Sequence, residues 1–265
     1  MCEIFCFNSN TPKQINNCLE CFYNHSEEHP HGWGLAKVQS DEFVIDKEPV
    51  KATCSQHLKN ILSHPVIGKN VFAHIRLATV GEIISPNCHP FTEFDDNNRS
   101  WLLIHNGTVF DYPKLDEYND KEIGDTDSER ILLYIIDKVN EYEKNKGCLS
   151  TIKERFNLLN DIIVDLSKKN KVNLMIFDGD MTYIHSNMRD SLYYLKNDEG
   201  FLVASTPLTD DEGWKPVELN KLFGLIDGNI IFESEEHQNE FILTEEHEKA
   251  IEEFLESINQ VDNDD

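Results

Sequence analysis

The chain has 265 residues, 39% of them hydrophobic and 28% charged, a composition typical of a globular protein with a large core. Its net charge of −25 repels phosphate backbones, which argues against nucleic-acid binding. No apolar stretch approaches the ~18 residues of a membrane span, and no basic segment followed by an apolar one marks a secretory signal. With 7 cysteines, an odd number, the sequence predicts reduced thiols and a cytoplasmic location.

The N-terminal half is predicted to alternate between strands and helices. Short apolar runs predict strands, and apolar residues at helical spacing predict helices. Residues 8–12 are rich in turn formers and residues 84–99 contain two prolines and a polar run, so both are expected to be irregular. The predicted strands span residues 2–7, 32–38, 70–77 and 101–105, and the predicted helices span residues 13–23 and 54–63.

The C-terminal half is predicted to hold long helices followed by strands. Thr126 and Glu129 have the spacing of a capping box, which predicts that a helix begins there. Because strands at both ends enclose helices, we expect layered α+β packing in a single domain over residues 1–260, with a disordered acidic tail over residues 261–265. The later elements are helices at 149–166 and 244–258 and strands at 173–178, 182–185, 192–195, 201–205, 221–226 and 229–232.

The second residue carries the first chemical signal. If Met1 is removed, which the small size of Cys2 favours, the chain begins with a thiol and a free α-amine on one residue. An α-amine titrates near ~7.7–8.0 and a thiol near ~8.5, so both are close to working pH. An N-terminal amine can activate such a nucleophile. The alternative is that Cys2 is simply part of an early apolar strand.

Two strand ends carry residues that suit a carboxylate and a developing oxyanion. Arg76 ends an apolar strand, where a buried guanidinium needs an anionic partner, either a ligand carboxylate or an internal acid. Asn106 and Gly107 follow a later apolar strand. Their pairing is typical of a turn, but a side-chain amide and an adjacent backbone N–H can also stabilise an oxyanion.

An acid in the first turn of the predicted helix completes the set. The helix dipole alone favours an acid at Asp127, and so does binding of a substrate amine. Together, the thiol, the oxyanion donors, the cation and the anion complement a substrate that has an α-carboxylate, an α-amine and a scissile carbonyl. A γ-glutamyl compound has these groups, and glutamine is the simplest one.

Five short motifs, in this order, resemble the class II glutamine amidotransferase domain. Residues 31–36 and 203–205 look like those of the compact subgroup that has no fused synthase. The resemblance covers residues 2–208 approximately, and it implies a four-layer αββα sandwich of the N-terminal nucleophile hydrolase type. The five motifs are Cys2, residues 74–79 (HIRLAT), residues 87–91 (NCHPF), residues 105–107 (HNG) and residues 126–129 (TDSE).

The resemblance implies three catalytic residues. Cys2 would attack the side-chain carbonyl of the substrate and form a thioester, while its α-amine handles the proton. Asn106 and the N–H group of Gly107 would hold the oxyanion. Water would then hydrolyse the thioester, so that glutamine yields glutamate and ammonia and a related γ-glutamyl amide yields an amine.

The resemblance also implies four substrate-binding residues. Arg76 would bind the α-carboxylate and Asp127 the α-amine, while Thr79 and His89 would shape the pocket. No cofactor and no metal are expected. The expected partners are the small-molecule substrate and a separate synthase subunit that accepts ammonia.

Two other classes of protein remain open. One is a catalytically silent glutamine-binding or regulatory module of the same fold, motivated by the absence of a synthase domain from this sequence, by His31 where the family often has an acid, and by Val80 where several fused members have histidine. The other is a metal or redox protein that uses Cys18 and Cys21, a C-x-x-C whose alternative is ordinary helix packing. The three histidines within residues 25–31 could also bind a metal, although their spacing has no fixed geometry.

Overall fold

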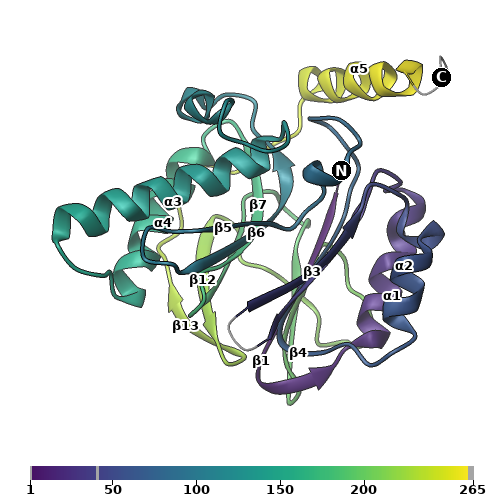
Figure 1. Ribbon diagram of the computed structural model, residues 1–265, viewed down its shortest axis with the longest axis horizontal. Helices are drawn as coiled ribbons and strands as arrows, with labels where there is room; N and C mark the ends of the chain where they lie inside the picture. Colours follow the sequence, from purple (N-terminus) through teal and green to yellow (C-terminus); the bar gives the residue numbers. More distant parts are fainter. Residues whose placement is uncertain (1, 40–41, 262–265) are drawn as a thin grey trace.

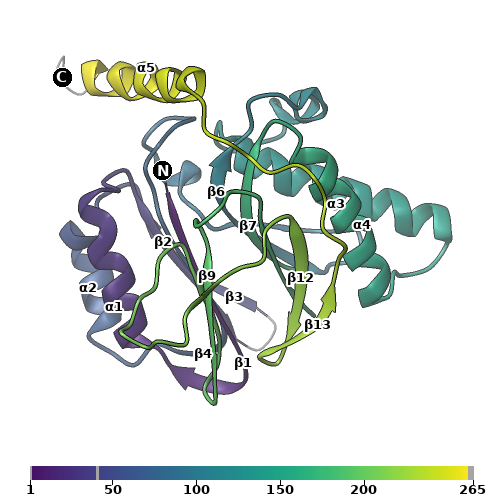
Figure 2. The ribbon, with the colours of Figure 1, turned by 180° about the vertical axis from the view of Figure 1, so that it is seen from behind.

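The computed structural model describes residues 2–39 and 42–261, with side chains described as far as Glu256. Two antiparallel sheets pack face to face, and a pair of helices covers the outer face of each sheet (Figure 1). The view from behind shows the same four layers in reverse order (Figure 2). The predicted α+β, four-layer αββα sandwich is therefore confirmed.

The first sheet has seven strands, and β1 lies in its middle. β1 is bonded to β10 on one side and to β4 on the other. Helices α1 (Asn16–Asn24) and α2 (Gln56–Leu62) cover the outer face of this sheet. In sheet order the strands are β11 (Lys215–Pro216), β9 (Tyr193–Asn197), β10 (Gly200–Ala204), β1 (Glu3–Gln14), β4 (Ile67–Ile75), β2 (Trp33–Gln39) and β3 (Glu42–Glu48).

The second sheet has six strands and is covered by α3 (Asp127–Lys146) and α4 (Ile152–Leu166). Helix α5 (Glu245–Val261) lies outside the layers, at the end of the molecule where β1 begins (Figure 1). Four short 3-10 helices span His25–Glu27, Ala52–Cys54, Ser85–Asn87 and Pro113–Tyr118. In sheet order the strands are β13 (Asn229–Glu233), β12 (Lys221–Ile226), β8 (Thr182–Ser186), β7 (Lys171–Phe177), β6 (Ser100–Thr108) and β5 (Phe91–Phe94).

Successive side chains of β1 point to opposite faces of the sheet and so belong to two of the three hydrophobic cores. Phe5 and Phe7 belong to the core under α1 and α2, whereas Ile4 and Cys6 belong to the core between the two sheets. The third core lies between the second sheet and helices α3 and α4. Strands β6 and β7 are covered on both faces, which explains why they are continuous apolar runs rather than alternating ones.

Residues 8–12, which the sequence predicts to be a turn, are instead part of β1. The strand runs through to Gln14, and a register shift between Asn8 and Lys13 accommodates the polar residues. The side chain of Asn8 supplies its own bonds there: its amide group donates to Asn70, and its oxygen accepts from the N–H of Gly228. Turn-forming residues are thus held in a strand by contacts that are distant in sequence.

Three of the described strands, β3, β5 and β11, are absent from the sequence predictions. All three lie at sheet edges, where one side of a strand faces no partner and the apolar pattern is weaker. β5 lies within residues 84–99, which were expected to be irregular throughout, and only Phe91 of its residues is buried.

Helix α3 begins after its predicted N-cap, Thr126, but the capping box is only half formed. The Thr126 hydroxyl accepts from the N–H of Glu129, as expected. The Glu129 carboxylate instead accepts from the N–H groups of Ile123 and Gly124, each at 2.9 Å. Glu129 therefore fixes the loop that precedes the helix.

The C-terminal helix is longer than predicted. α5 ends at Val261, which the sequence analysis assigned to a disordered tail. The helical spacing of apolar residues continues from Phe254 through Ile258 to Val261, which accounts for the extension. Residues 262–265, the rest of the predicted tail, lie outside the described residues.

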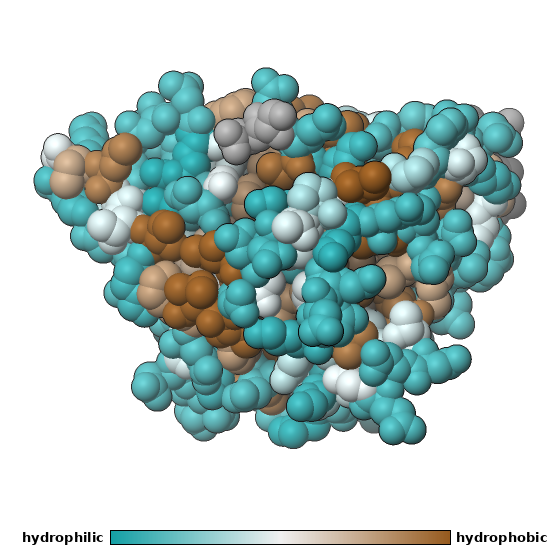
Figure 3. Space-filling view, turned by 90° about the horizontal axis from the view of Figure 1, so that it is seen from below, coloured by the Kyte–Doolittle hydropathy of each residue, from teal (hydrophilic) through white to brown (hydrophobic). Residues whose placement is uncertain are grey.

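Hydrophilic side chains cover most of the face seen from below, with separate apolar patches between them (Figure 3). Within residues 2–39 and 42–261, none of the helices combines the length and apolarity needed to cross a bilayer.

Candidate active site

Strand register brings distant chain segments to one end of the sandwich. Glu3 pairs with Ile75 across β1 and β4, so Cys2 lies beside the segment that follows β4. In the second sheet, Thr108 pairs with Lys171, so the end of β6 lies beside the start of β7. These segments and the first turn of α3 meet around one cavity.

The cavity is small, with a volume of about 20 Å³. Of the predicted site residues, only Asn106 does not line it. The lining comprises Cys2, Arg76, Thr79, His89, Gly107 and Asp127, together with Leu77, Ala78, Val80, His105, Thr126 and Ser128.

The Cys2 thiol is half-buried at the head of β1. Its Sγ donates to the carbonyl oxygen of Leu77 at 3.3 Å, which holds the sulfur against the loop after β4. Met1, whose removal would free the α-amine, lies outside the described residues, so the free amine stays a prediction.

Arg76 is buried, and its guanidinium binds the loop that follows it. It donates to the carbonyl oxygens of Val80 at 2.9 Å, Gly81 at 3.1 Å and Glu82 at 2.8 Å. These partners are neutral, so they leave the positive charge uncompensated, and arginine carries more N–H donors than these three bonds use. The arrangement favours the ligand carboxylate over an internal acid as the anionic partner of Arg76.

Gly107 and Asn106 lie at the end of β6. A side chain at Gly107 would overlap the backbone oxygen of Lys171 and the ring of His105, so this position requires glycine. Asn106 is buried behind the cavity wall, where its oxygen accepts from Nζ of Lys171 at 2.9 Å and its amide group faces Oγ of Ser205 at 3.4 Å.

Asp127 is buried in the first turn of α3. One carboxylate oxygen accepts from the N–H of Val109 at 2.8 Å, and the other lies 3.2 Å from the hydroxyl of Ser128. The same hydroxyl lies 3.0 Å from Nδ1 of His105, while the hydroxyl of Thr79 is 3.1 Å from that of Thr108. Asp127 is thus anchored on one side and faces the cavity on the other.

His89 stacks on His74, with ring centroids 4.0 Å apart. Both rings are buried, and burial first, then neighbouring positive groups, hold each pKa well below its usual range. Within the described residues, neither ring nitrogen of His89 has a hydrogen-bond partner. His89 is therefore a neutral, buried wall of the cavity whose ring nitrogens are unpartnered among the described residues.

Three residues of the site were missed by the sequence analysis: His105, Ser128 and Lys171. His105 and Ser128 lie inside the motifs at residues 105–107 and 126–129, but the sequence predicts no role for either of them. Lys171 lies two residues before the strand predicted at 173–178, so it was expected outside the sheet, whereas it is the first residue of β7.

The alternative metal and redox sites are not supported by the geometry. Cys18 and Cys21 pack on α1 against the core under that helix, and burial raises the pKa of both thiols. In the part of the chain that the structure describes, no group of three His, Cys, Asp or Glu residues is arranged to hold a metal. His31 has a structural role: its Nδ1 accepts from the N–H of Ala78 at 2.9 Å and so supports the loop after β4.

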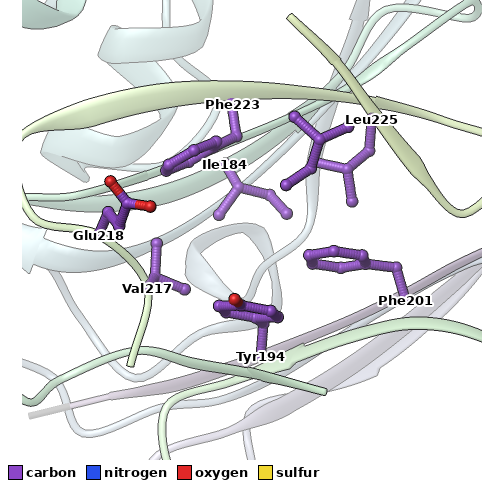
Figure 4. Close-up of a pocket in the computed structure, with 8 residues that line it drawn as sticks. Ile184, Tyr194, Phe201, Val217, Glu218, Phe223 and Leu225 are labelled. Carbon is purple, nitrogen blue, oxygen red and sulfur yellow. The ribbon is translucent and has the colours of Figure 1, made fainter. Parts of the chain in front are cut away.

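A second cavity, of about 40 Å³, lies between the two sheets, away from Cys2. Figure 4 shows its lining of aliphatic and aromatic side chains with one carboxylate, Glu218. The Glu218 carboxylate forms an ion pair with Lys221 at 2.7 Å, so the charged group of this lining is already paired.

The family model described as "Glutamine amidotransferases class-II" matches residues 1–197, a range that includes all seven predicted site residues. The chain belongs to the class II glutamine amidotransferases. This amidotransferase is 29% identical over 263 residues to an uncharacterized protein of Methanocaldococcus jannaschii, covering 88% of this chain and 71% of that protein. It is 26% identical over 249 residues to the Escherichia coli K12 protein named "Putative glutamine amidotransferase YafJ", covering 82% of this chain and 94% of that protein.

Solved structures confirm the fold of this amidotransferase. A glutamine amidotransferase structure from Pseudomonas aeruginosa superposes with a TM-score of 0.61 at 18% identity, covering 87% of this chain and 99% of that one. Glutamine phosphoribosylpyrophosphate amidotransferase from B. subtilis superposes with a TM-score of 0.62 at 18% identity, covering 88% of this chain and 49% of that one.

Proposed function

We propose that this protein hydrolyses the γ-amide bond of glutamine, or of a related γ-glutamyl compound, through a thioester on Cys2. The observation that carries the proposal is the single cavity lined by the Cys2 thiol, the Arg76 guanidinium and the Asp127 carboxylate. A nucleophile, a cation and an anion in one small cavity match the three functional groups of a γ-glutamyl substrate.

Recognition of the glutamyl part follows from charge. The α-carboxylate takes the remaining N–H donors of Arg76, whose present partners are neutral carbonyl oxygens. The α-amine binds Asp127, which is held in place by the N–H of Val109. Thr79 and His89 line the cavity between these ends and fix the side chain of the substrate.

The chemistry follows in two steps. Sγ of Cys2 attacks the side-chain carbonyl carbon, the C–N bond breaks, and the nitrogen leaves as ammonia or an amine with the thiol proton, which the α-amine of Cys2 transfers. Asn106 and the N–H of Gly107 stabilise the oxyanion. Water then attacks the thioester, releases glutamate and regenerates the thiol; a separate synthase subunit is the proposed acceptor of ammonia.

The test compares protein whose intact mass confirms an N-terminal Cys2 with the Cys2→Ala variant. Ammonia and glutamate release are measured from L-glutamine and from a panel of γ-glutamyl amides. We expect release by the wild type and a loss of at least roughly 10³-fold in the variant, since the covalent route is removed. Cys54→Ala, which removes an exposed thiol, is the control and should keep full activity.

Two results would contradict the proposal. A fully active Cys2→Ala variant would exclude the thioester. Glutamine binding without turnover of any γ-glutamyl amide by the correctly processed wild type would identify a silent binding module instead.

A further inference from the structure

Lys171 is a charged residue in an unusual place. It is the first residue of β7, a strand whose residues are all buried, and its own side chain is only 2% exposed. Lysine is rarely buried this completely, because removing an ammonium group from water is costly unless nearby groups compensate it. The position therefore needs a reason beyond filling space.

The head group of Lys171 binds the proposed oxyanion residue. Its Nζ donates to Oδ1 of Asn106 at 2.9 Å. An ammonium group can only donate hydrogen bonds, so the oxygen of the Asn106 carboxamide must face Lys171 and the NH₂ group must face away from it. Lys171 thus decides which way the carboxamide is oriented.

The opposite side of the carboxamide faces the strand that carries the nucleophile. Nδ2 of Asn106 lies 3.4 Å from Oγ of Ser205, and the same Oγ accepts from the N–H of Ile4 at 3.0 Å. Ile4 is two residues from Cys2 on β1. An NH₂ group has two hydrogen atoms, so one remains for an oxyanion after the contact with Ser205.

Burial lowers the pKa of Lys171 to about 8. At neutral pH its side chain therefore carries the three N–H donors of an ammonium group.

We propose, on the basis of the function proposed above, that Lys171 is a positioning residue of the thioester reaction: it turns the NH₂ group of Asn106 toward the oxyanion. No proton or electron passes through Lys171 in this role. It acts only on the orientation of Asn106.

The test replaces Lys171 by methionine, which has similar length and no charge, and by arginine, which keeps the charge. The parameters kcat and KM are measured for each variant with the best γ-glutamyl substrate. The control is Lys196→Met, which removes an exposed lysine bonded only to Asn229 among the contacts that the structure describes.

In Lys171→Met, we expect kcat to fall by roughly 10–100-fold with little change in KM, because the oxyanion is affected more than ground-state binding. Lys171→Arg, which keeps a donor toward Asn106, should recover most of kcat, and Lys196→Met should change neither kcat nor KM. Thermal unfolding identifies a variant that has failed to fold, in which case Lys171→Gln replaces Lys171→Met.

An unchanged kcat in a folded, uncharged variant would overturn the inference while the proposed function stands. A wild type that turns over no γ-glutamyl amide would defeat the proposed function, and the inference with it.

Discussion

The two sides of the cavity are built differently. The strand side, defined by Cys2, Asn106 and Gly107, lies at the ends of β1 and β6 in hydrogen-bonded sheets. The loop side, defined by Arg76, Thr79, His89 and Asp127, lies on the segments after β4, before β5 and at the start of α3. The proposed bond-breaking residues are thus on one side, and the proposed binding residues are on the other.

The two sides are also held in place differently. Register with neighbouring strands fixes the strand side, as between Gly107 and Val172. The loop side depends on side chains that bond to backbone or to each other: Arg76 binds three loop carbonyl oxygens, and Asn87 and Asp125 bond to each other across two loops. A reaction that requires fixed geometry lies on the rigid side, and recognition lies where a few side chains set the shape.

The largest effect is expected on the strand side, from Gly107→Ala. The added methyl group would overlap the backbone oxygen of Lys171 and the ring of His105, so the end of β6 must shift. Displacing an oxyanion donor reduces kcat by roughly 10²–10³-fold. Steady-state kinetics measure this loss. Gly213→Ala, whose methyl group would meet only side-chain atoms, is the control, and equal activities of the two variants would show that the strand side tolerates displacement.

A smaller and different effect is expected on the loop side, from Arg76→Lys. The change keeps the positive charge but removes the planar fork that binds a carboxylate in a bidentate manner and holds residues 80–82. We expect KM to rise by roughly 10–100-fold with a smaller change in kcat, because binding is lost more than bond chemistry. A fall in kcat at constant KM would instead place Arg76 functionally with the strand side.

The smallest effect is on stability, at His89. The pKa of this buried ring is held well below its usual range, whereas the unfolded chain takes up a proton near pH ~6.5. The unfolded state therefore binds more protons in acid, and the free energy of unfolding falls as the pH drops below 6.5, by at most about 2 kcal/mol between pH 7 and pH 5 for this group.

His89→Phe removes the titrating group and the unpartnered ring nitrogens from a buried wall. Urea unfolding at pH 5 and pH 7 should show a weaker loss of stability in acid for His89→Phe than for the wild type, together with weaker substrate binding. Equal losses of stability in the two proteins would mean that His89 does not titrate on unfolding.

The strand side could be predicted more fully from the sequence than the loop side. Apolar runs locate β1 and β6, and the ends of these runs carry Cys2, Asn106 and Gly107. The pairing of Asn106 with Lys171 could not be predicted, because these residues are 65 positions apart in the sequence and meet only through strand register. Periodicity reports which face of a strand is buried, but it does not report which strand lies next to it.

The sequence predicts the residues of the loop side, but not the contacts that hold these residues in place. Glu129 was expected to cap α3 and instead binds the loop before it. His31 differs from the acid common in the family, and its bond to Ala78 shows that it supports the loop after β4. Such contacts depend on a path of the backbone that no local pattern encodes.

The position of β1 has a consequence for synthesis of the protein on the ribosome. The nucleophile is made first, but its strand gains one of its two neighbours, β10, only when residues 200–204 have emerged, and Ser205 then binds the N–H of Ile4 across 201 positions. Contacts of such long range slow folding. The thiol of Cys2 therefore acquires its complete surroundings only after residues 200–205 have been translated.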